Sequence, residues 1–309
     1  MALKRTVPVI ITCDFDPTPE IQKGAKNECM AIALDLFAEA GIHATLFYTA
    51  TFIDQYIGRL LPDVLKNGHE IACHGLTHGF EEEFDKMKEN QVRDHLTKAT
   101  KLLEDFSGQA IRSFRGPRVK TSAVTQGVLE SLGYTADASV CSQRVDFISS
   151  NLINFGWIRA PRLPYHPHPK DAYRSGNRRL WVVPVSAIVL PFVSGTIYTF
   201  GVNYAKFLFQ LLYRESLKTG KPIMFLLHPA EFVPGTEKVE HPFHLKNLFI
   251  EGFRFRRAPW LFEQDAAKRI EGNRRLYAYM RSFPFVEFVT LKNYVQRLES
   301  VQKKHDTSV

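Results

Sequence analysis

The sequence has little cysteine and no paired cysteine motif. Four cysteines stand in 309 residues, and none forms a C-x-x-C pair with another: Cys13, Cys29, Cys73 and Cys141. This count excludes a disulfide scaffold and a cysteine-rich zinc finger, and it fits a reducing compartment. Glycine and proline, at 18 and 17 residues, are too few for a collagen-like or low-complexity chain. We therefore expect a packed globular protein.

Long uninterrupted apolar runs are also missing. The first apolar run, from Val7 to Cys13, is too short for the core of a secretory leader. Residues 180–205 carry no charge, but prolines such as Pro184 and Pro191 interrupt them, so a buried strand and loop is expected instead of a membrane span. We expect a cytoplasmic protein, and peripheral attachment to the inner face of the membrane stays open.

The excess of positive charge is concentrated near the C-terminal end. Net charge is +8, and residues 244–281 hold nine Lys or Arg against four Asp or Glu. Seven aromatic residues share this stretch, among them those of R-F-R-R-A-P-W-L-F at 254–262. Two interpretations stay open: contact with anionic lipid headgroups, or a barrel helix whose aromatic residues pack inward. A nucleic-acid partner is not expected, and the sequence leaves the oligomeric state undetermined.

The pattern of apolar residues predicts strands that alternate with helices. Strands are expected at 7–12, 44–48, 70–73, 113–114, 134–136, 180–185 and 223–227, and within 285–298 ahead of a last helix. Helices are expected at 28–40, toward 66, at 84–106, 121–132, 204–217 and 262–280. Such alternation implies a parallel sheet covered by helices, which means a barrel or a doubly wound α/β fold.

Titratable side chains follow five of these strands. They are Asp14 and Asp16, His74 and His78, Arg115, Asp137, and His228. Because the carboxyl ends of parallel strands meet at one edge of the sheet, we expect these side chains to gather in a single site.

The two histidines of H-G-L-T-H and the two aspartates of D-F-D suit a catalytic metal. Two imidazoles, His74 and His78, and one carboxylate leave an open coordination position for water. Asp14 and Asp16 lie two residues apart on an extended chain, so they point the same way and can divide into ligand and base. We expect Zn²⁺, although Mn²⁺, Co²⁺ or Fe²⁺ suit the same ligand types. Arg115 is predicted to orient the base, and His228 to protonate a leaving amine.

In this order, these residues resemble the NodB-homology polysaccharide deacetylases, carbohydrate esterase family 4, over roughly residues 7–232. The resemblance implies that Asp14 is the base, and that Asp16, His74 and His78 hold the metal. In F-R-G-P-R it implies that Arg115 orients the base, and that the backbone N–H after Pro117, which belongs to Arg118, joins the oxyanion site. In L-L-H-P it implies that His228 is the general acid.

The same resemblance implies the fold and the domain. The expected fold is a distorted (β/α)7-type barrel, the NodB-homology fold. The whole chain, 1–309, would form one deacetylase domain, with the motifs within 7–232 and with 233–309 completing the barrel and carrying the basic, aromatic-rich segment.

Two departures from the family pattern refine the expectation. The spaced aspartates resemble a subgroup that acts on exopolysaccharides or lipid-linked sugars. The phrase H-P-A-E-F at 228–232 places Glu231 as a residue that lines the site. The partner that tunes His228 stays open between Asp137 and Asp146.

The sequence thus predicts a metal-dependent N-deacetylase that hydrolyses the acetamide of an amino sugar in a polysaccharide or lipid-linked precursor. One alternative is a deformylase or a cyclic-amide (allantoinase-like) hydrolase with the same machinery, distinguished by its product. Another is a noncatalytic carbohydrate or nucleic-acid binding protein, which RNA binding with a steep salt dependence and no metal would favour. The complete set of catalytic residue types argues against the noncatalytic alternative.

Overall fold

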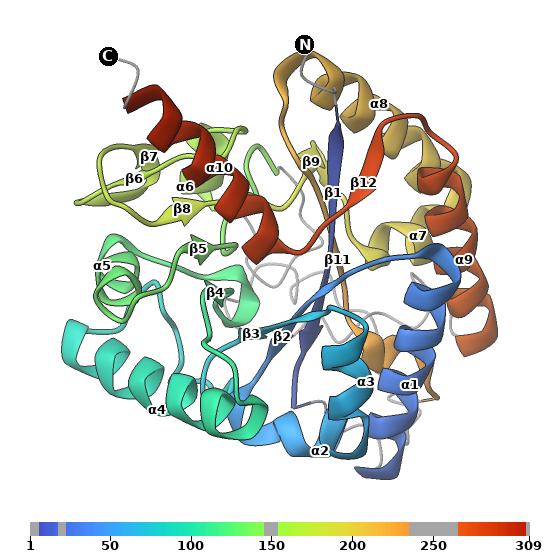
Figure 1. The fold of residues 1–309 in the computed structure, drawn as a ribbon, viewed down its shortest axis with the longest axis horizontal. Helices are drawn as coiled ribbons and strands as arrows, with labels where there is room; N and C mark the ends of the chain where they lie inside the picture. Colours follow the sequence, from blue (N-terminus) through green and yellow to red (C-terminus); the bar gives the residue numbers. More distant parts are fainter. Residues whose placement is uncertain (1–5, 18–22, 145–153, 235–264, 307–309) are drawn as a thin grey trace, which may run out of the picture.

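A curled parallel sheet surrounded by helices forms the centre of the molecule (Figure 1). The structure, a computed structural model, describes residues 6–17, 23–144, 154–234 and 265–306. The strands pair in the order β11-β1-β2-β3-β4-β5-β8, and β12 also pairs with β1. Their bounds are β1 Val7–Phe15, β2 Thr45–Tyr48, β3 Glu70–Cys73, β4 Ser113–Phe114, β5 Ala136–Asp137, β8 Trp181–Val182, β11 Ile223–Leu227 and β12 Val286–Phe288. All these pairings are parallel.

Helices cover the outside of this sheet. They are α1 Lys23–Ala40, α2 Ile53–Ile57, α3 Leu61–Lys66, α4 Glu89–Ser107, α5 Ala123–Ser131, α6 Phe155–Arg159, α7 Ser194–Phe200, α8 Val202–Thr219, α9 Ala266–Arg281 and α10 Leu291–Asp306. Single 3-10 turns occur at Ala50–Phe52, Gly58–Leu60, Pro117–Val119 and Pro229–Phe232. Figure 1 shows α1, α8 and α9 along one side of the sheet and α4 and α5 on the other. The alternating strands and helices confirm the predicted distorted (β/α)7-type barrel.

The first strand is buried on both faces, and its two faces meet different cores. Val9 and Ile11 pack in the layer between sheet and helices, whereas Ile10 packs with Phe47 and Met224 inside the barrel. Since side chains alternate along a strand, Asp14 shares the inner face with Ile10. The strand thus delivers a carboxylate to the barrel interior at its carboxyl end.

The barrel is open between its outer strands. Among the described residues β8 and β11 do not pair, and the chain between them crosses the opening. There the backbone N–H of Ser186 donates to Met224 (3.1 Å), and Val193 forms a bridge with Leu226. Two antiparallel ribbons complete the strands: β6 Pro167–His168 pairs with β7 Asp171–Ser175 ahead of β8, and β9 Ala187–Ile188 pairs with β10 Leu190–Pro191 between β8 and β11.

Helix α10 closes the amino end of the barrel. Its side chains Leu291, Tyr294 and Val295 pack into the interior core. Its first backbone N–H groups donate to side chains at the starts of two strands, Leu291 to Thr45 (2.8 Å) and Lys292 to the carboxylate of Glu70 (2.9 Å). A helix N-terminus leaves such N–H groups without intrahelical partners, so these side chains act as its caps.

Two helix starts differ from the sequence prediction by five residues. Helix α4 begins at Glu89, not at 84, because Phe84 lies in a turn whose carbonyl accepts from Ser122 and Thr125 while its ring packs in the core. Helix α1 begins at Lys23, five residues before the predicted start.

The basic, aromatic-rich segment is described only from residue 265 onward. In that part Tyr277 is buried, and Tyr279 packs edge-on against Phe209 and Phe283. These two aromatic residues therefore face the protein, as the inward-packing interpretation expects. Residues 244–264 lie outside the described ranges, as does Asp146, and the prediction of one domain over 1–309 stays a prediction.

Candidate active site

The two aspartates stand where β1 leaves the barrel. Asp14 is the penultimate residue of the strand and is buried, and Asp16 follows it directly outside. The hydroxyl of Tyr56, from α2, donates to the backbone carbonyl of Asp16 at 2.6 Å. This bond fixes the backbone on which the second carboxylate sits.

Both histidines of H-G-L-T-H meet the Asp16 carboxylate. Its Oδ1 lies 3.2 Å from Nε2 of His74 and 3.4 Å from Nε2 of His78. One ligand atom from each of the three residues lies within 4.8 Å of the others. Nδ1 of His74 is 2.7 Å from the carbonyl of Arg115, which can only accept, so Nδ1 carries the proton and Nε2 presents its lone pair. This donor set fits a divalent transition metal.

The protonation of these groups reflects competition between burial and charge. Burial acts to raise the pKa of Asp16, but the neighbouring histidines outweigh it and hold that pKa well below its ordinary value. Burial lowers the pKa of His78, which leaves a neutral imidazole. For His74 burial acts downward, but Asp14 and Asp16 together raise its pKa. Asp16 and His78 are thus shifted toward the forms that bind metal, an ionised carboxylate and a neutral imidazole, whereas His74 would have to give up a proton to a bound cation.

Arg115 lies completely buried inside the barrel beside Asp14. Its Nη1 donates to Oδ1 of Asp14 at 2.6 Å and to the hydroxyl of Thr12 at 2.9 Å. Its Nε donates to the carbonyl of Ala138 at 3.1 Å, and its guanidinium carbon is 4.4 Å from the centre of the Phe47 ring. The guanidinium therefore holds one oxygen of Asp14, while the other, Oδ2, lies 3.9 Å from Nε2 of His74 on the side of the three ligands.

His228 reaches the same place from the end of β11. Its Nε2 lies 3.9 Å from Oδ2 of Asp16, and its Nδ1 lies 3.5 Å from the carboxylate of Glu231, which is buried. The structure thus brings together Asp14, Asp16, His74, His78, Arg115 and His228. Glu231 contacts His228 directly, whereas the sequence placed it only as a residue lining the site.

Asp137 is positioned differently from the sequence prediction, in which Asp137 or Asp146 supports His228. Both oxygens of its buried carboxylate are occupied, by the N–H and hydroxyl of Ser139 and by the side chains of Thr121 and Gln126. Ser139 Oγ accepts in turn from the N–H of Gly116 (2.8 Å), so Asp137 braces the loop that follows β4. The carboxylate beside His228 is Glu231, because the 3-10 turn Pro229–Phe232 folds that side chain back three residues. Asp137 therefore does not contact His228, whereas Asp146 lies outside the described residues and stays a prediction.

Two side chains hydrogen-bond to the backbone of the loop that carries His78, and the sequence alone did not predict these contacts. The carboxylate of Glu82, fully buried, accepts from the backbone N–H groups of Leu76, Thr77 and His78. The guanidinium of Arg118, predicted only for its backbone N–H, donates to the carbonyls of Gly79 and Glu82. Pro117 precedes it and begins the 3-10 turn in which Arg118 has φ +58°. In the sequence, Glu82 is the middle of three consecutive glutamates, a pattern typical of a solvated surface.

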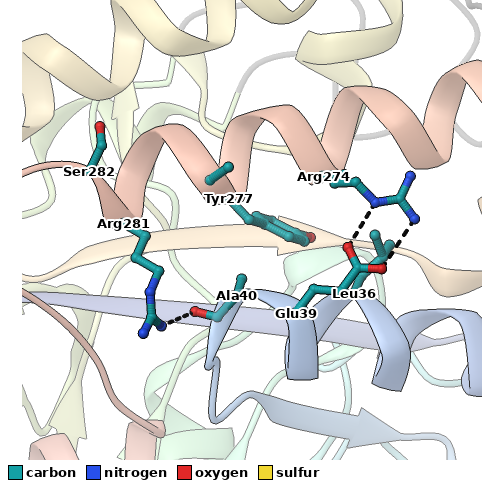
Figure 2. Close-up of a pocket in the computed structure, with 8 residues that line it drawn as sticks. Leu36, Glu39, Ala40, Arg274, Tyr277, Arg281 and Ser282 are labelled. Atoms are coloured by element: carbon teal, nitrogen blue, oxygen red, sulfur yellow. Dashed lines mark hydrogen bonds and ion pairs between the residues drawn. The ribbon is translucent and has the colours of Figure 1, made fainter.

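A separate hollow lies between α1 and α9 (Figure 2). Arg274 pairs there with Glu39 at 2.8 Å, and Arg281 donates to the backbone carbonyl of Ala40 at the end of α1. The hollow shares no residue with the group around Asp16. Its charged groups join the two helices, and a cation at the C-terminus of α1 complements the helix dipole.

A curled parallel barrel with titratable groups gathered at the carboxyl ends of its strands is the architecture of a barrel enzyme. Residues 5–136 match the family model of polysaccharide deacetylases. The chain is therefore similar to polysaccharide deacetylases over these residues, and members of that family are hydrolases that act on amide C–N bonds.

Solved structures share the fold at low sequence identity. A Mycobacterium smegmatis protein assigned as a polysaccharide deacetylase is 16% identical with a TM-score of 0.66, over 98% of this chain and 93% of that one. One from Pseudomonas aeruginosa PAO1, assigned likewise, is 16% identical with a TM-score of 0.60, over 95% and 90%. PuuE allantoinase is 15% identical with a TM-score of 0.58, over 97% and 92%.

One curated relative matches in sequence. The bifunctional xylanase/deacetylase of Pseudobutyrivibrio xylanivorans is 25% identical over 113 residues, which are 37% of this chain and 17% of that protein. The match thus spans less than a fifth of the relative's length. None of the helices in the described part of the chain combines the length and apolar character that crossing a bilayer requires.

Proposed function

We propose that this protein is a metal-dependent N-deacetylase, which hydrolyses the acetamide group of an amino sugar. The observation that carries the proposal is the meeting of Asp16, His74 and His78 beside Asp14 at the mouth of the barrel. Those three residues would hold a divalent cation, with Zn²⁺ as the first choice, and the bound cation would supply Lewis acidity for the attacking water and the amide carbonyl. The similarity to polysaccharide deacetylases over residues 5–136 supports the reaction class.

The protein's own residues then divide the proton transfers. Arg115 fixes one oxygen of Asp14, so the other oxygen, which faces the ligands, takes the proton of the attacking water. The water oxygen bonds to the carbonyl carbon, and the backbone N–H of Arg118 is assigned to the carbonyl oxygen as negative charge develops there.

His228 acts on the opposite side of the substrate. It gives a proton to the nitrogen as the C–N bond breaks, so the products are acetate and a free amine. The carboxylate of Glu231, 3.5 Å from its Nδ1, is the group proposed to support this proton transfer.

Paired variants separate metal binding from proton transfer. Asp16→Ala is expected to abolish bound metal and turnover together. Asp14→Asn is expected to keep the metal and lower turnover about 10²–10⁴-fold, the effect typical of a lost general base. Asp35→Asn, on the exposed face of α1, serves as the control for removal of one carboxylate. If Asp16→Ala kept both metal and turnover, the ligand assignment would be refuted.

Product analysis decides the substrate. Mass spectrometry detects loss of one acetyl group from lipid-linked, nucleotide-linked and polymeric amino sugars, with added metal and with a chelator. Release of formate, or ring opening of a cyclic ureide such as an allantoinase uses, would assign the same machinery to another amide. The absence of turnover on all of them with metal bound would refute the deacetylase proposal.

The composition of the basic, aromatic-rich segment favours a substrate sugar that is linked to a lipid. The segment combines a net positive charge with aromatic residues such as Trp260 and Phe262, the composition of an interfacial contact with anionic lipid. Flotation with phosphatidylserine-containing and neutral vesicles tests this contact. Equal binding, or none, to both vesicle types would remove the membrane from the proposal.

A further inference from the structure

A loop that we call the metal loop, residues 74–83, runs from the first histidine ligand past the second and returns toward α4. Glu82 lies within it, and its carboxylate turns back on the loop's own backbone. Its Oε1 accepts from the N–H of Leu76 at 2.7 Å, and its Oε2 accepts from the N–H of Thr77 at 2.9 Å and of His78 at 2.5 Å. One side chain therefore binds three consecutive amides, the last of which belongs to a metal ligand.

This arrangement has a physical reason in the backbone. His78 has φ +57°, a left-handed conformation that a residue other than glycine adopts only when its surroundings hold it there. Three successive N–H groups in such a turn form a concavity for an anion, and bonds to a charged acceptor are shorter and stronger than neutral ones. The Glu82 carboxylate is that anion, and the protein supplies it internally.

Two further contacts hold the carboxylate and the rest of the loop. Nδ1 of His95, on α4, lies 3.0 Å from Oε1 of Glu82. On the other side of the loop, the Arg118 guanidinium donates to the carbonyls of Gly79 at 3.1 Å and of Glu82 at 3.0 Å. The loop's N–H groups are thus fixed by an anion and its carbonyls by a cation.

We infer that Glu82 is a positioning residue for the metal centre: it presets the backbone of His78 so that the imidazole meets Asp16 and His74 before any ion arrives. The inference rests on the proposed function, because it concerns the same three ligands. Glu82 itself is no ligand, since its carboxylate is engaged with the loop's amides. Its removal should therefore weaken metal binding without removing a donor atom from the site.

The variant Glu82→Gln tests the inference. The side-chain amide keeps the shape but turns N–H hydrogens toward backbone N–H groups, so at least one of the three bonds is lost. The full-length chain is stripped with a chelator, reloaded with Co²⁺ or Zn²⁺, and titrated against a competing chelator. We expect about 10–100-fold weaker binding, as is typical when the support of a ligand is removed, together with a changed visible spectrum of bound Co²⁺.

Glu81→Gln is the matched control, because Glu81 is exposed and carries the same charge in the same loop while its carboxylate accepts from the Thr77 hydroxyl. Its affinity and Co²⁺ spectrum are expected to equal those of the native chain. Unfolding curves of the metal-free proteins show whether the Glu82→Gln fold is intact, and unchanged curves with weakened binding support the positioning role.

His95→Leu keeps the inference testable if Glu82→Gln fails to fold. It removes only the outer contact to Glu82, at a partly exposed position, and is expected to weaken metal binding by less than about tenfold. If Glu82→Gln folds and binds metal with native affinity, the inference is overturned while the proposed function stands. If Glu82→Gln does not fold, native metal affinity in His95→Leu has the same meaning. A native chain that takes up no metal would overturn the proposed function and this inference with it.

Discussion

Replacing Asp14 by Asn leaves the guanidinium of Arg115 inside the barrel without its counter-charge. The two side chains are 3% and 0% exposed, and their atoms lie 2.6 Å apart, so water cannot take the place of the lost carboxylate. Removing one partner of a buried pair typically costs about 3–5 kcal/mol of unfolding free energy. Arg115 keeps neutral acceptors at Thr12 and Ala138 and the face of Phe47, so we expect about 3 kcal/mol, the lower end of that range.

The assay is urea unfolding of the chelator-treated protein, followed by tryptophan fluorescence and circular dichroism. Arg115→Met supplies the second arm of a double-mutant cycle, because a thioether fits beside Met224 and carries no charge. The double variant should be more stable than the sum of the single losses predicts, with a coupling energy of about 2 kcal/mol. A loss below about 1 kcal/mol for Asp14→Asn, or losses that add within about 0.5 kcal/mol, would refute the account of a buried, mutually dependent pair.

Three further predictions concern positions away from that pair. Burial lowers the pKa of His69 to about 4, so the unfolded chain binds the proton first, and stability falls as pH drops from about 6.5 to 4. His69→Asn should remove up to about 3 kcal/mol of that pH dependence, measured by urea unfolding at several pH values. The same change of unfolding free energy with pH in the variant and the native chain would contradict this prediction. Glu70→Ala removes the acceptor of the Lys292 N–H at the start of α10 and should lower the free energy of unfolding in urea by about 0.5–2 kcal/mol. Because this end of the barrel is remote from the proposed metal ligands, the variant should bind metal with native affinity. Gly75→Ala places a Cβ 3.0 Å from both Glu82 and Pro117 at φ +82°, so it should cost about 1–2 kcal/mol and weaken metal binding; a chelator titration matching the native chain would count against the strained loop.

The residues that the sequence predicts well are those whose chemistry and chain position coincide. Asp14, His74 and Arg115 each follow or end a short apolar strand, and in a parallel sheet that position alone brings them to one edge. Their meeting at one edge could therefore be predicted from the sequence, and their roles stay predictions. Thr12 had the same signal, since it lies two residues before Asp14 on the same face of the strand.

The features that the sequence did not predict depend on how the loops fold over the barrel, and the spacing of apolar residues carries no information about loop conformation. Phe84 continues the apolar spacing of the helix that follows, although it is buried in a turn. The sequence pattern therefore places the start of α4 five residues too early. Glu231, and not Asp137, lies beside His228 among the described residues, because a single 3-10 turn reverses the chain there. Glu82 stands in a run of acids that resembles solvated surface, and only the folded loop reveals that its carboxylate is buried.

Strand β1 carries Asp14, the proposed base, and pairs with strands from both halves of the chain. Its outer half, Thr12–Phe15, pairs with β2, while Val9 pairs with both Ile223 and Phe288. Contacts so distant in sequence slow folding, and strand edges left unpaired meanwhile favour aggregation. A nascent chain that ends after residue 136 contains Asp14, Asp16, His74 and His78, yet it has only one neighbour for β1. Assembly of the candidate site is therefore expected late in synthesis, and expression of residues 1–136 alone should yield insoluble protein.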